Sequence, residues 1–208
     1  MAKLYYRYST MNAGKSIDLI RTNHNYLEND KKTICFTSSK DDRYGKGKIT
    51  SRIGISIDAI QVFDDTNIFN IVFDIVRFNH EDISCVFVDE VQFLKKEHIF
   101  QLSDIVDKLN IPVICYGLRS DFKLEPFEAS KYLMSISDEI EEIKTICFEC
   151  KTKKAIVNSR ILNGYVTIEG EQIQIGGNEI YKPLCRKCFK MLLNKWKLKN
   201  TNYILKVY

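Results

Sequence analysis

The residues best suited to chemistry form one stretch near the start of the chain, Ser9-Thr10-Met11-Asn12-Ala13-Gly14-Lys15-Ser16. In a loop of this kind, successive backbone N–H groups hold phosphate oxygens, and the helix that follows adds a partial positive charge. The sequence predicts that Lys15 reaches the outer phosphates of a bound ligand and that the Ser16 hydroxyl binds magnesium. Ser9 stands where the usual P-loop pattern has Gly, so its backbone must suit a side chain. The alternative is a Gly-Lys-Ser that occurs by chance at the start of a helix.

A pair of carboxylates, Asp89 and Glu90, follows the apolar run Cys85–Val88. Four apolar residues without alternation predict a strand that is buried on both faces. Downstream of a P-loop this is a Walker B pattern, so Asp89 is expected to hold magnesium with Ser16. Glu90 is the candidate general base, because successive strand side chains point in different directions and can do different work. Without the P-loop, a turn that caps a helix would explain both residues.

The C-terminal part of the chain contains two Cys-x-x-Cys pairs, Cys147/Cys150 and Cys185/Cys188, with 34 residues between them. Four thiolates are a ligand set for tetrahedral zinc, and a closed site of this kind has no open position, so the metal is expected to be structural. The alternatives are four unpaired core cysteines or two redox pairs. The remaining cysteines each lie in an apolar run and are expected to be inert core residues: Cys35, Cys85 and Cys115.

The elements that must position these groups alternate between strands and helices. Strands are predicted at residues 4–8, 33–37, 53–57, 85–88 and 111–117, and helices at 17–27, 68–78, 99–109 and 126–133. This order predicts an α/β fold with a mainly parallel sheet and helices on both faces. The polar stretch 38–48 is predicted to be a mobile loop. Its Asp41 and Arg43 come just after a strand, where α/β sheets place their ligands.

A change of composition after residue 144 predicts a second domain. The expected division is a nucleotide-binding domain over 1–144, a zinc-binding domain over 145–190 and a tail over 191–208. A hairpin over 166–175 is expected to lead into Gly176-Gly177, where bare backbone can approach a ligand closely. Residues 191–196 are predicted to form a short amphipathic helix, with a mobile end after it.

Length and composition restrict the class of protein. The chain has 208 residues, 45% of them apolar, which is typical of a globular protein. It contains no apolar run of about 18 residues and no signal-like start, so we expect a cytoplasmic protein without a membrane partner. The net charge of +4 is too small to predict a nucleic-acid partner but suits a small anionic ligand.

Over about Lys3–Phe189 the chain resembles the type II thymidine kinases, the zinc-containing cellular kind found in bacteria and animals. The motifs that carry the resemblance, by their order and spacing, are Ser9–Ser16, Lys40-Asp41-x-Arg43-Tyr44, Asp89-Glu90-x-Gln92-Phe93, Gly117-Leu118-x-x-x-Phe122, Pro126-Phe127, Ile175-Gly176-Gly177, Tyr181 and the two cysteine pairs. The resemblance implies a RecA-like P-loop sheet with a small zinc-ribbon domain, whose "lasso" loop holds the base largely through backbone groups.

The implied reaction is magnesium-dependent transfer of the ATP γ-phosphate to the 5′-hydroxyl of thymidine, and of deoxyuridine, giving dTMP in nucleotide salvage. Arg43 would neutralise charge on the moving group, with Asp41 supporting its loop, and Gln92 would join the ATP site. The residues implied to contact the nucleoside are Met11, Phe93, Leu118, Phe122, Phe127, Ile173, Ile175, Gly176, Gly177 and Tyr181, with Asn158 near the base. The resemblance also implies a homotetramer that is inhibited by dTTP.

Two alternatives stay open on the residues alone. One is a zinc-ribbon protein that binds nucleic acid and uses ATP as a switch, which Arg186, Lys187 and the basic tail favour and the modest net charge opposes. The other is a P-loop kinase for a different small acceptor, since pocket residues do not by themselves name a base.

Overall fold

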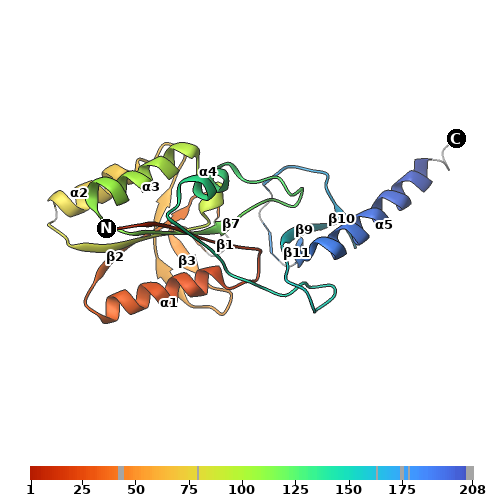
Figure 1. Cartoon of the computed structure of the whole chain (residues 1–208), viewed down its shortest axis with the longest axis horizontal. Helices are drawn as coiled ribbons and strands as arrows, with labels where there is room; N and C mark the ends of the chain where they lie inside the picture. The colour runs from red at the N-terminus through yellow and green to blue at the C-terminus, as the bar shows by residue number, and fades with distance from the viewer. Residues whose placement is uncertain (42–44, 79, 163, 174–175, 178, 205–208) are drawn as a thin grey trace. The chain divides into compact units, whose positions relative to one another are not determined.

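The computed structural model describes the whole chain except residues 42–44, 79, 163, 174–175, 178 and 205–208, and the side chains of 199–204 (Figure 1). The chain forms two compact units. The first contains Met1–Tyr8, Gly14–Arg119 and Phe127–Ile143, and the second contains Ser9–Ala13, Ser120–Pro126 and Lys144–Tyr208. Two short segments that precede Lys144 in the chain therefore belong to the second unit, and one of them, Ser9–Ala13, is the first part of the phosphate loop.

The first unit is built on a six-stranded sheet. Its strands in spatial order are β5 (Ile60–Val62), β2 (Lys32–Ser38), β6 (Ile83–Asp89), β7 (Val113–Leu118), β1 (Leu4–Ser9) and β8 (Glu139–Glu142). The pairs β1/β8, β2/β5, β2/β6 and β6/β7 are all parallel. Parallel neighbours need crossovers between them, and the helices of the chain supply these. The predicted α/β class is confirmed.

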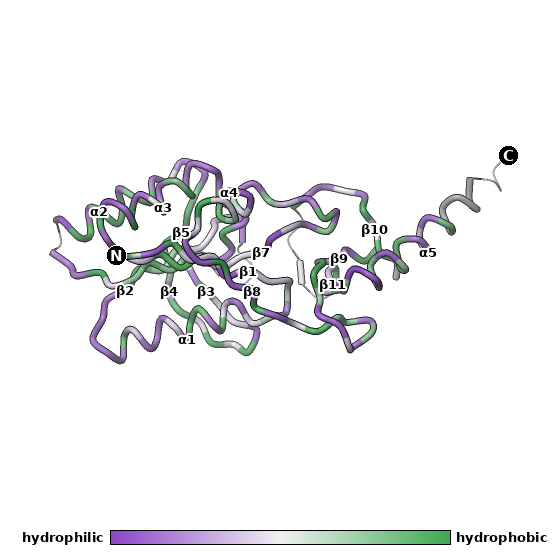
Figure 2. The backbone as a smooth tube through the Cα atoms, in the orientation of Figure 1, coloured by the Kyte–Doolittle hydropathy of each residue, from purple (hydrophilic) through white to green (hydrophobic). Residues whose placement is uncertain are grey.

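Helices cover both faces of this sheet (Figure 1). Helix α1 (Lys15–Glu28) lies on one face, and α2 (Ile68–Phe78), α3 (Lys96–Leu109) and α4 (Glu128–Ile136) lie on the other. Strand β6 contributes to two cores, because Phe87 belongs to the core that contains Leu19 of α1, and its neighbour Val86 belongs to the core that contains Ile99 of α3. Hydrophobic and hydrophilic residues alternate along these helices, as expected when one helix face contacts a sheet (Figure 2).

The three single cysteines lie inside these cores, as the sequence predicts. Burial raises the pKa of Cys35 and of Cys85 to about 12, and it raises the pKa of Cys115 as well. Thiols with such a raised pKa are poor nucleophiles at neutral pH. They therefore contribute packing volume to the sheet.

The strand predicted over residues 53–57 is wrong in extent, because only Ser56 and Ile57 of that range lie in a strand. Residues there form a hairpin of β3 (Lys48–Thr50) and β4 (Ser56–Asp58), joined by a turn in which the Ser51 N–H donates to the Ile55 carbonyl at 2.8 Å. Gly54 has a φ of 89°, which turns the chain. Ile53 and Ile55 are exposed at that turn, so their alternation in the sequence does not reflect packing against a core.

The second unit contains an antiparallel sheet in the order β10 (Tyr165–Thr167), β9 (Val157–Leu162) and β11 (Tyr181–Leu184). The hairpin predicted over 166–175 is therefore wrong, because β9 pairs with β10 and residues 168–173 are not in a strand. The missed signal was Asn163-Gly164, a dipeptide typical of two-residue hairpin turns.

Helix α5 (Arg186–Ile204) follows β11 directly. The predicted short helix over 191–196 with a mobile end is wrong in extent, because the helix begins five residues earlier and continues to Ile204. The sequence contains no Gly or Pro between Arg186 and Ile204 that would end it.

In the described part of the chain, no helix is both long enough and apolar enough to cross a membrane. A short 3₁₀ turn, η1 (Val91–Phe93), completes the elements of the first unit.

Candidate active site

The phosphate loop can have Ser at position 9 because this residue still belongs to strand β1, where the backbone conformation suits a side chain. Ser9 is the last residue of β1 and is not among the described residues with positive φ. The left-handed backbone needed in this loop falls at Asn12 (φ 64°) and Gly14 (φ 85°). Asn tolerates this conformation better than most residues, and Gly adopts it freely. Helix α1 then begins at Lys15, which is buried.

The two residues predicted to bind magnesium are in direct contact. The Ser16 hydroxyl donates to Asp89 Oδ2 at 2.8 Å, and the Glu90 N–H donates to Asp89 Oδ1 at 2.9 Å. Burial, and after it the charge of Glu90, raises the pKa of the Asp89 carboxyl above its ordinary value. A bound cation would favour the charged form of that carboxyl, and hydroxyl and carboxylate oxygens are the donors that magnesium prefers.

Glu90 has a left-handed backbone, with φ 49° and ψ 38°. This conformation is uncommon for a residue with a side chain, and such residues concentrate at functional sites. It occurs where β6 gives way to η1. The different roles predicted for Asp89 and Glu90 stay a prediction.

Both polar atoms of the Gln92 carboxamide have protein partners. Its Nε2 donates to the Glu90 carboxylate, and its Oε1 accepts from the Leu118 N–H at 3.0 Å. Gln92 is only 3% exposed. A Cβ at Gly117 would lie 2.7 Å from Gln92 Oε1, so glycine makes room for this carboxamide. The structure therefore connects Glu90 to the end of β7 through one buried side chain.

Three of the residues implied to contact the nucleoside lie in the first unit. The Leu118 carbonyl accepts from the Tyr6 hydroxyl at 3.1 Å and from the Ser130 hydroxyl at 2.6 Å. Phe93 and Phe127 meet edge to face, with ring centroids 6.0 Å apart. Phe127 is buried, whereas Phe93 and Leu118 are half-buried and keep accessible surface.

The other described members lie in the second unit. Met11 is half-buried, and its N–H donates to Asn158 Oδ1 at 2.7 Å. Asn158, implied near the base, thus binds the backbone of the phosphate loop. The remaining loop residues are a buried Thr10, an exposed Asn12 whose carbonyl accepts from the Thr145 hydroxyl at 3.4 Å, and a half-buried Ala13.

The lasso segment is described at four of its five predicted contact residues. Ile173 is exposed, Gly176 and Gly177 are half-buried, and Tyr181 is buried. The Tyr181 N–H donates to the Gly177 carbonyl at 2.9 Å, which joins the loop to the start of β11. The predicted Ile175, like the predicted catalytic Arg43, lies outside the described residues.

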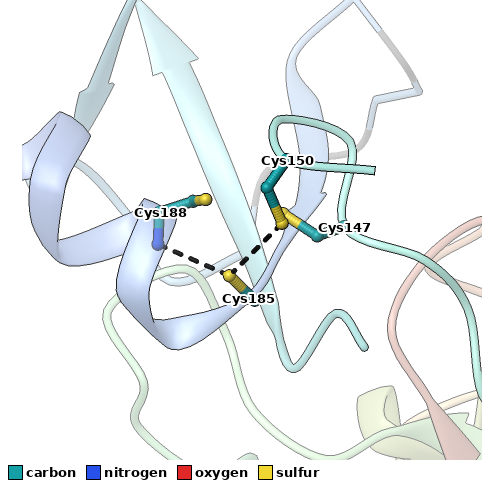
Figure 3. Close-up of side chains that lie close together, drawn as sticks. All are labelled: Cys147, Cys150, Cys185 and Cys188. Carbon is teal, nitrogen blue, oxygen red and sulfur yellow. Dashed lines mark hydrogen bonds between the residues drawn. The ribbon is translucent and has the colours of Figure 1, made fainter. Parts of the chain in front are cut away.

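The four paired cysteines converge (Figure 3). Their sulfur atoms all lie within 4.8 Å of one another, and Sγ of Cys150 is 4.0 Å from Sγ of Cys185. Four zinc–sulfur bonds of about 2.3 Å in a tetrahedron would place the sulfurs about 3.8 Å apart. The donor set and its spacing therefore fit zinc. Cys188 lies in the first turn of α5, and its N–H donates to Cys185 Sγ at 3.5 Å.

Sequence reasoning missed one buried residue of the second unit. Arg160 of β9 is 5% exposed and contacts both Phe122 and Tyr181. The available signal was a single arginine inside the strand-like run Val157–Leu162, where the other residues are apolar or small and neutral.

A parallel sheet, a loop ending in Gly-Lys-Ser before α1, and a buried strand-end aspartate on the serine define a P-loop nucleotide-binding protein. The family model for thymidine kinase matches residues 2–189. The chain belongs to the thymidine kinase family.

Individual relatives agree with that assignment. The chain is 53% identical to "Thymidine kinase" of Lactiplantibacillus plantarum, over 89% of this chain and 94% of the relative. It is 52% identical to "Thymidine kinase" of Haemophilus influenzae strain Rd, over 91% and 97%, and 51% identical to that of Listeria monocytogenes EGD-e, over 90% and 96%. A solved structure of an ATPase domain covers 79% of each chain at 14% identity with a TM-score of 0.48, a likeness too low to add to the argument.

Proposed function

We propose that this protein transfers the γ-phosphate of ATP to the 5′-hydroxyl of thymidine, and also of deoxyuridine. Membership of the thymidine kinase family supports the acceptor. The observation that carries the chemistry is the 2.8 Å contact between Ser16 and Asp89, with Glu90 next in the chain. Phosphoryl transfer depends mainly on positioning and charge neutralisation, and this group of residues can supply both.

The proposed mechanism divides the work among the residues of the first unit. Lys15 and the amides of the phosphate loop hold the ATP phosphates. Ser16 and Asp89 would hold magnesium, and the bound ion would supply charge neutralisation at the phosphates. Glu90 orients the 5′-hydroxyl and accepts its proton, and Gln92 fixes the Glu90 carboxylate by its hydrogen bond. Arg43 stabilises charge on the moving phosphoryl group, with Asp41 supporting its loop.

We propose as nucleoside contacts the residues that the family resemblance implies. Phe93, Leu118 and Phe127 supply apolar surface. The other implied contacts are the backbone of Gly176-Gly177 and the side chains of Met11, Phe122, Ile173, Ile175 and Tyr181. We keep Asn158 as a support of Met11, because its side chain binds the Met11 N–H.

We also propose structural zinc at the four paired cysteines, whose sulfurs lie within 4.8 Å. The division into an ATP-binding part over 1–144, a zinc-binding part over 145–190 and a tail remains our proposal. So do a cytoplasmic homotetramer, inhibition by dTTP and the absence of a nucleic-acid partner.

The test is transfer of label from γ-labelled ATP, with magnesium, to thymidine, deoxyuridine, deoxycytidine and the purine deoxynucleosides. Labelling of thymidine and deoxyuridine alone is the expected result. Equal labelling of several bases would keep the kinase and reject the thymidine assignment. An absence of labelling with folded, zinc-loaded protein would reject the kinase.

A further inference from the structure

The three-stranded sheet of the second unit has two faces of different character. Val157, Val166 and Leu184 lie on one face and pack with the paired cysteines and Phe189. Because side chains alternate along a strand, Arg160 of β9 belongs to the opposite face. Its direct cross-strand partners are Thr167 on β10 and Tyr181 on β11, so these three side chains share that face.

On that face, the Arg160 guanidinium joins three separate segments. Its Cζ lies 3.6 Å from the centroid of the Phe122 ring, a close stacking contact with the Ser120–Pro126 segment. Its Nη2 donates to the Tyr181 hydroxyl at 2.8 Å and to the Glu171 carbonyl, also at 2.8 Å. One side chain thus holds a ring, a phenol and the beginning of the lasso segment.

The neighbouring backbone is shaped for this guanidinium. Gly170 has a φ of 106°, and a Cβ there would lie 2.7 Å from Arg160 Nη1. Any other residue at position 170 would be strained and would also displace the arginine. The turn at Gly170 and the stacking on Phe122 are two independent signs that this place is built around Arg160.

Burying the charged Arg160 guanidinium costs free energy unless partners in the protein replace the water it loses. Arg160 is 5% exposed, and its Nε has no hydrogen-bond partner among the described residues. Removing a cation from water is expensive, and its contacts here are a ring, a hydroxyl and a carbonyl. Arginine suits them because its planar fork stacks on a ring face while donating in its own plane, whereas lysine is a flexible point charge.

We propose that Arg160 is a positioning residue for nucleoside recognition, which fixes Phe122, Tyr181 and the Glu171 end of the lasso in the geometry that binds the base. This inference rests on the proposed function, because it takes Phe122 and Tyr181 as nucleoside contacts. Arg160 acts through these residues and has no part in the transfer of the phosphoryl group.

The test compares wild type with Arg160→Lys and Arg160→Met by steady-state kinetics with each substrate varied in turn. Lysine keeps the charge, and methionine keeps much of the apolar stem. We expect the KM for thymidine to rise about tenfold or more in both, as for the loss of a hydrogen bond to a charged group. The KM for ATP should stay within about twofold of wild type, because the described contacts of Arg160 are with Phe122, Glu171 and Tyr181.

Controls separate positioning from general damage. Arg77→Lys, at an exposed position of α2, should leave both KM values unchanged. Zinc content should stay at the wild-type level in all variants. A role in folding alone would instead lower zinc content and thermal stability and change both KM values together.

A double-mutant cycle with Tyr181→Phe tests whether Arg160 affects the thymidine KM through its hydrogen bond to Tyr181. Tyr181→Phe deletes only the hydroxyl that accepts from Arg160, and we expect it to raise the thymidine KM about threefold or more. In that background Arg160→Lys should have a smaller effect, because the two residues share one interaction. Should both Arg160 variants fail to fold, Tyr181→Phe alone still decides, since an unchanged thymidine KM would reject the proposal.

The outcomes distinguish this proposal from the proposed function. Wild type that phosphorylates thymidine, together with folded Arg160 variants whose thymidine KM is within about twofold of wild type, would overturn the role of Arg160 and keep the function. Wild type that labels a different deoxynucleoside would reject the thymidine assignment, and the same KM comparison would then be made with that nucleoside. A wild type without any nucleoside activity would reject both.

Discussion

The side-chain oxygen of Asn158 accepts a hydrogen bond from the backbone N–H of Met11 at 2.7 Å, although the two residues are 147 positions apart in the chain. Asn158 lies on β9, and Met11 lies in the middle of the phosphate loop. Asn158 is 5% exposed, so water has little access as a replacement acceptor. The conformation of the loop at Met11 therefore depends on a strand of the second unit, the unit that also contains the four paired cysteines.

Asn158→Ala should disturb the phosphate loop from a distance. A partly buried N–H that loses its acceptor costs on the order of 1 kcal/mol, so we expect kcat/KM for ATP to fall about tenfold. The measurement is steady-state kinetics with ATP varied, and Asn25→Ala at an exposed position of α1 is the control. An unchanged kcat/KM for ATP would mean that the loop keeps its conformation without this hydrogen bond.

Glu90→Gln tests the general base. The substitution keeps the size of the side chain and removes its ability to accept a proton, so kcat should fall about 10²–10⁴-fold. Binding of thymidine and ATP, measured by calorimetry, should persist. Glu28→Gln, at an exposed position near the end of α1, should behave as wild type. A folded Glu90→Gln protein that retains most of its turnover would remove Glu90 from this role.

Gln92→Leu tests whether this side chain positions Glu90 or binds ATP. Leucine fills a similar volume but loses both hydrogen bonds, to Glu90 and to the Leu118 N–H. We expect kcat to fall about tenfold or more while the KM for ATP changes little, because the lost contacts hold the base rather than a substrate. A large rise in the KM for ATP with an unchanged kcat would favour direct contact with the phosphates.

Cys185→Ser tests the metal site. Purified wild type should contain about one zinc per chain, and the variant should lose most of it, because three ligands hold zinc more weakly than four. Hydrogen exchange should then accelerate in residues 145–190 and remain slow in the six-stranded sheet, whose core is separate from that of the cysteines. Wild type with less than about half a zinc per chain would contradict a structural zinc site.

Thiol labelling provides an independent check of cysteine environments. At pH 8 a thiol whose pKa is about 12 is ionised to roughly one part in 10⁴, so Cys35 and Cys85 should resist alkylation in the folded protein, as should the fully buried Cys115. A chelator should expose the four paired cysteines to reagent, and denaturant should bring the total to seven. Rapid labelling of Cys35 before denaturation would contradict the buried environment described here.

The sequence by itself determined the parts of this protein that depend on local pattern. Continuous apolar runs predicted the buried strands around Cys85–Val88 and the parallel sheet, and doubled cysteine pairs predicted a metal site. Spacing also placed Ser16 and Asp89 in one site, because a P-loop and a following strand end at the same edge of a parallel sheet. These short motifs needed no knowledge of distant contacts.

Tertiary structure alone decided the features that arise from pairing between distant segments. Strand β8 (Glu139–Glu142) contains one apolar residue, and it forms because it pairs with β1. The alternation of Ile53 and Ile55 predicted a strand wrongly, because both side chains are exposed and contact no core. The Met11–Asn158 hydrogen bond and the contacts of Arg160 have the same origin. Hydrogen bonds and ring contacts depend on positions in space, and no local pattern records which residue 147 positions away will satisfy a given N–H.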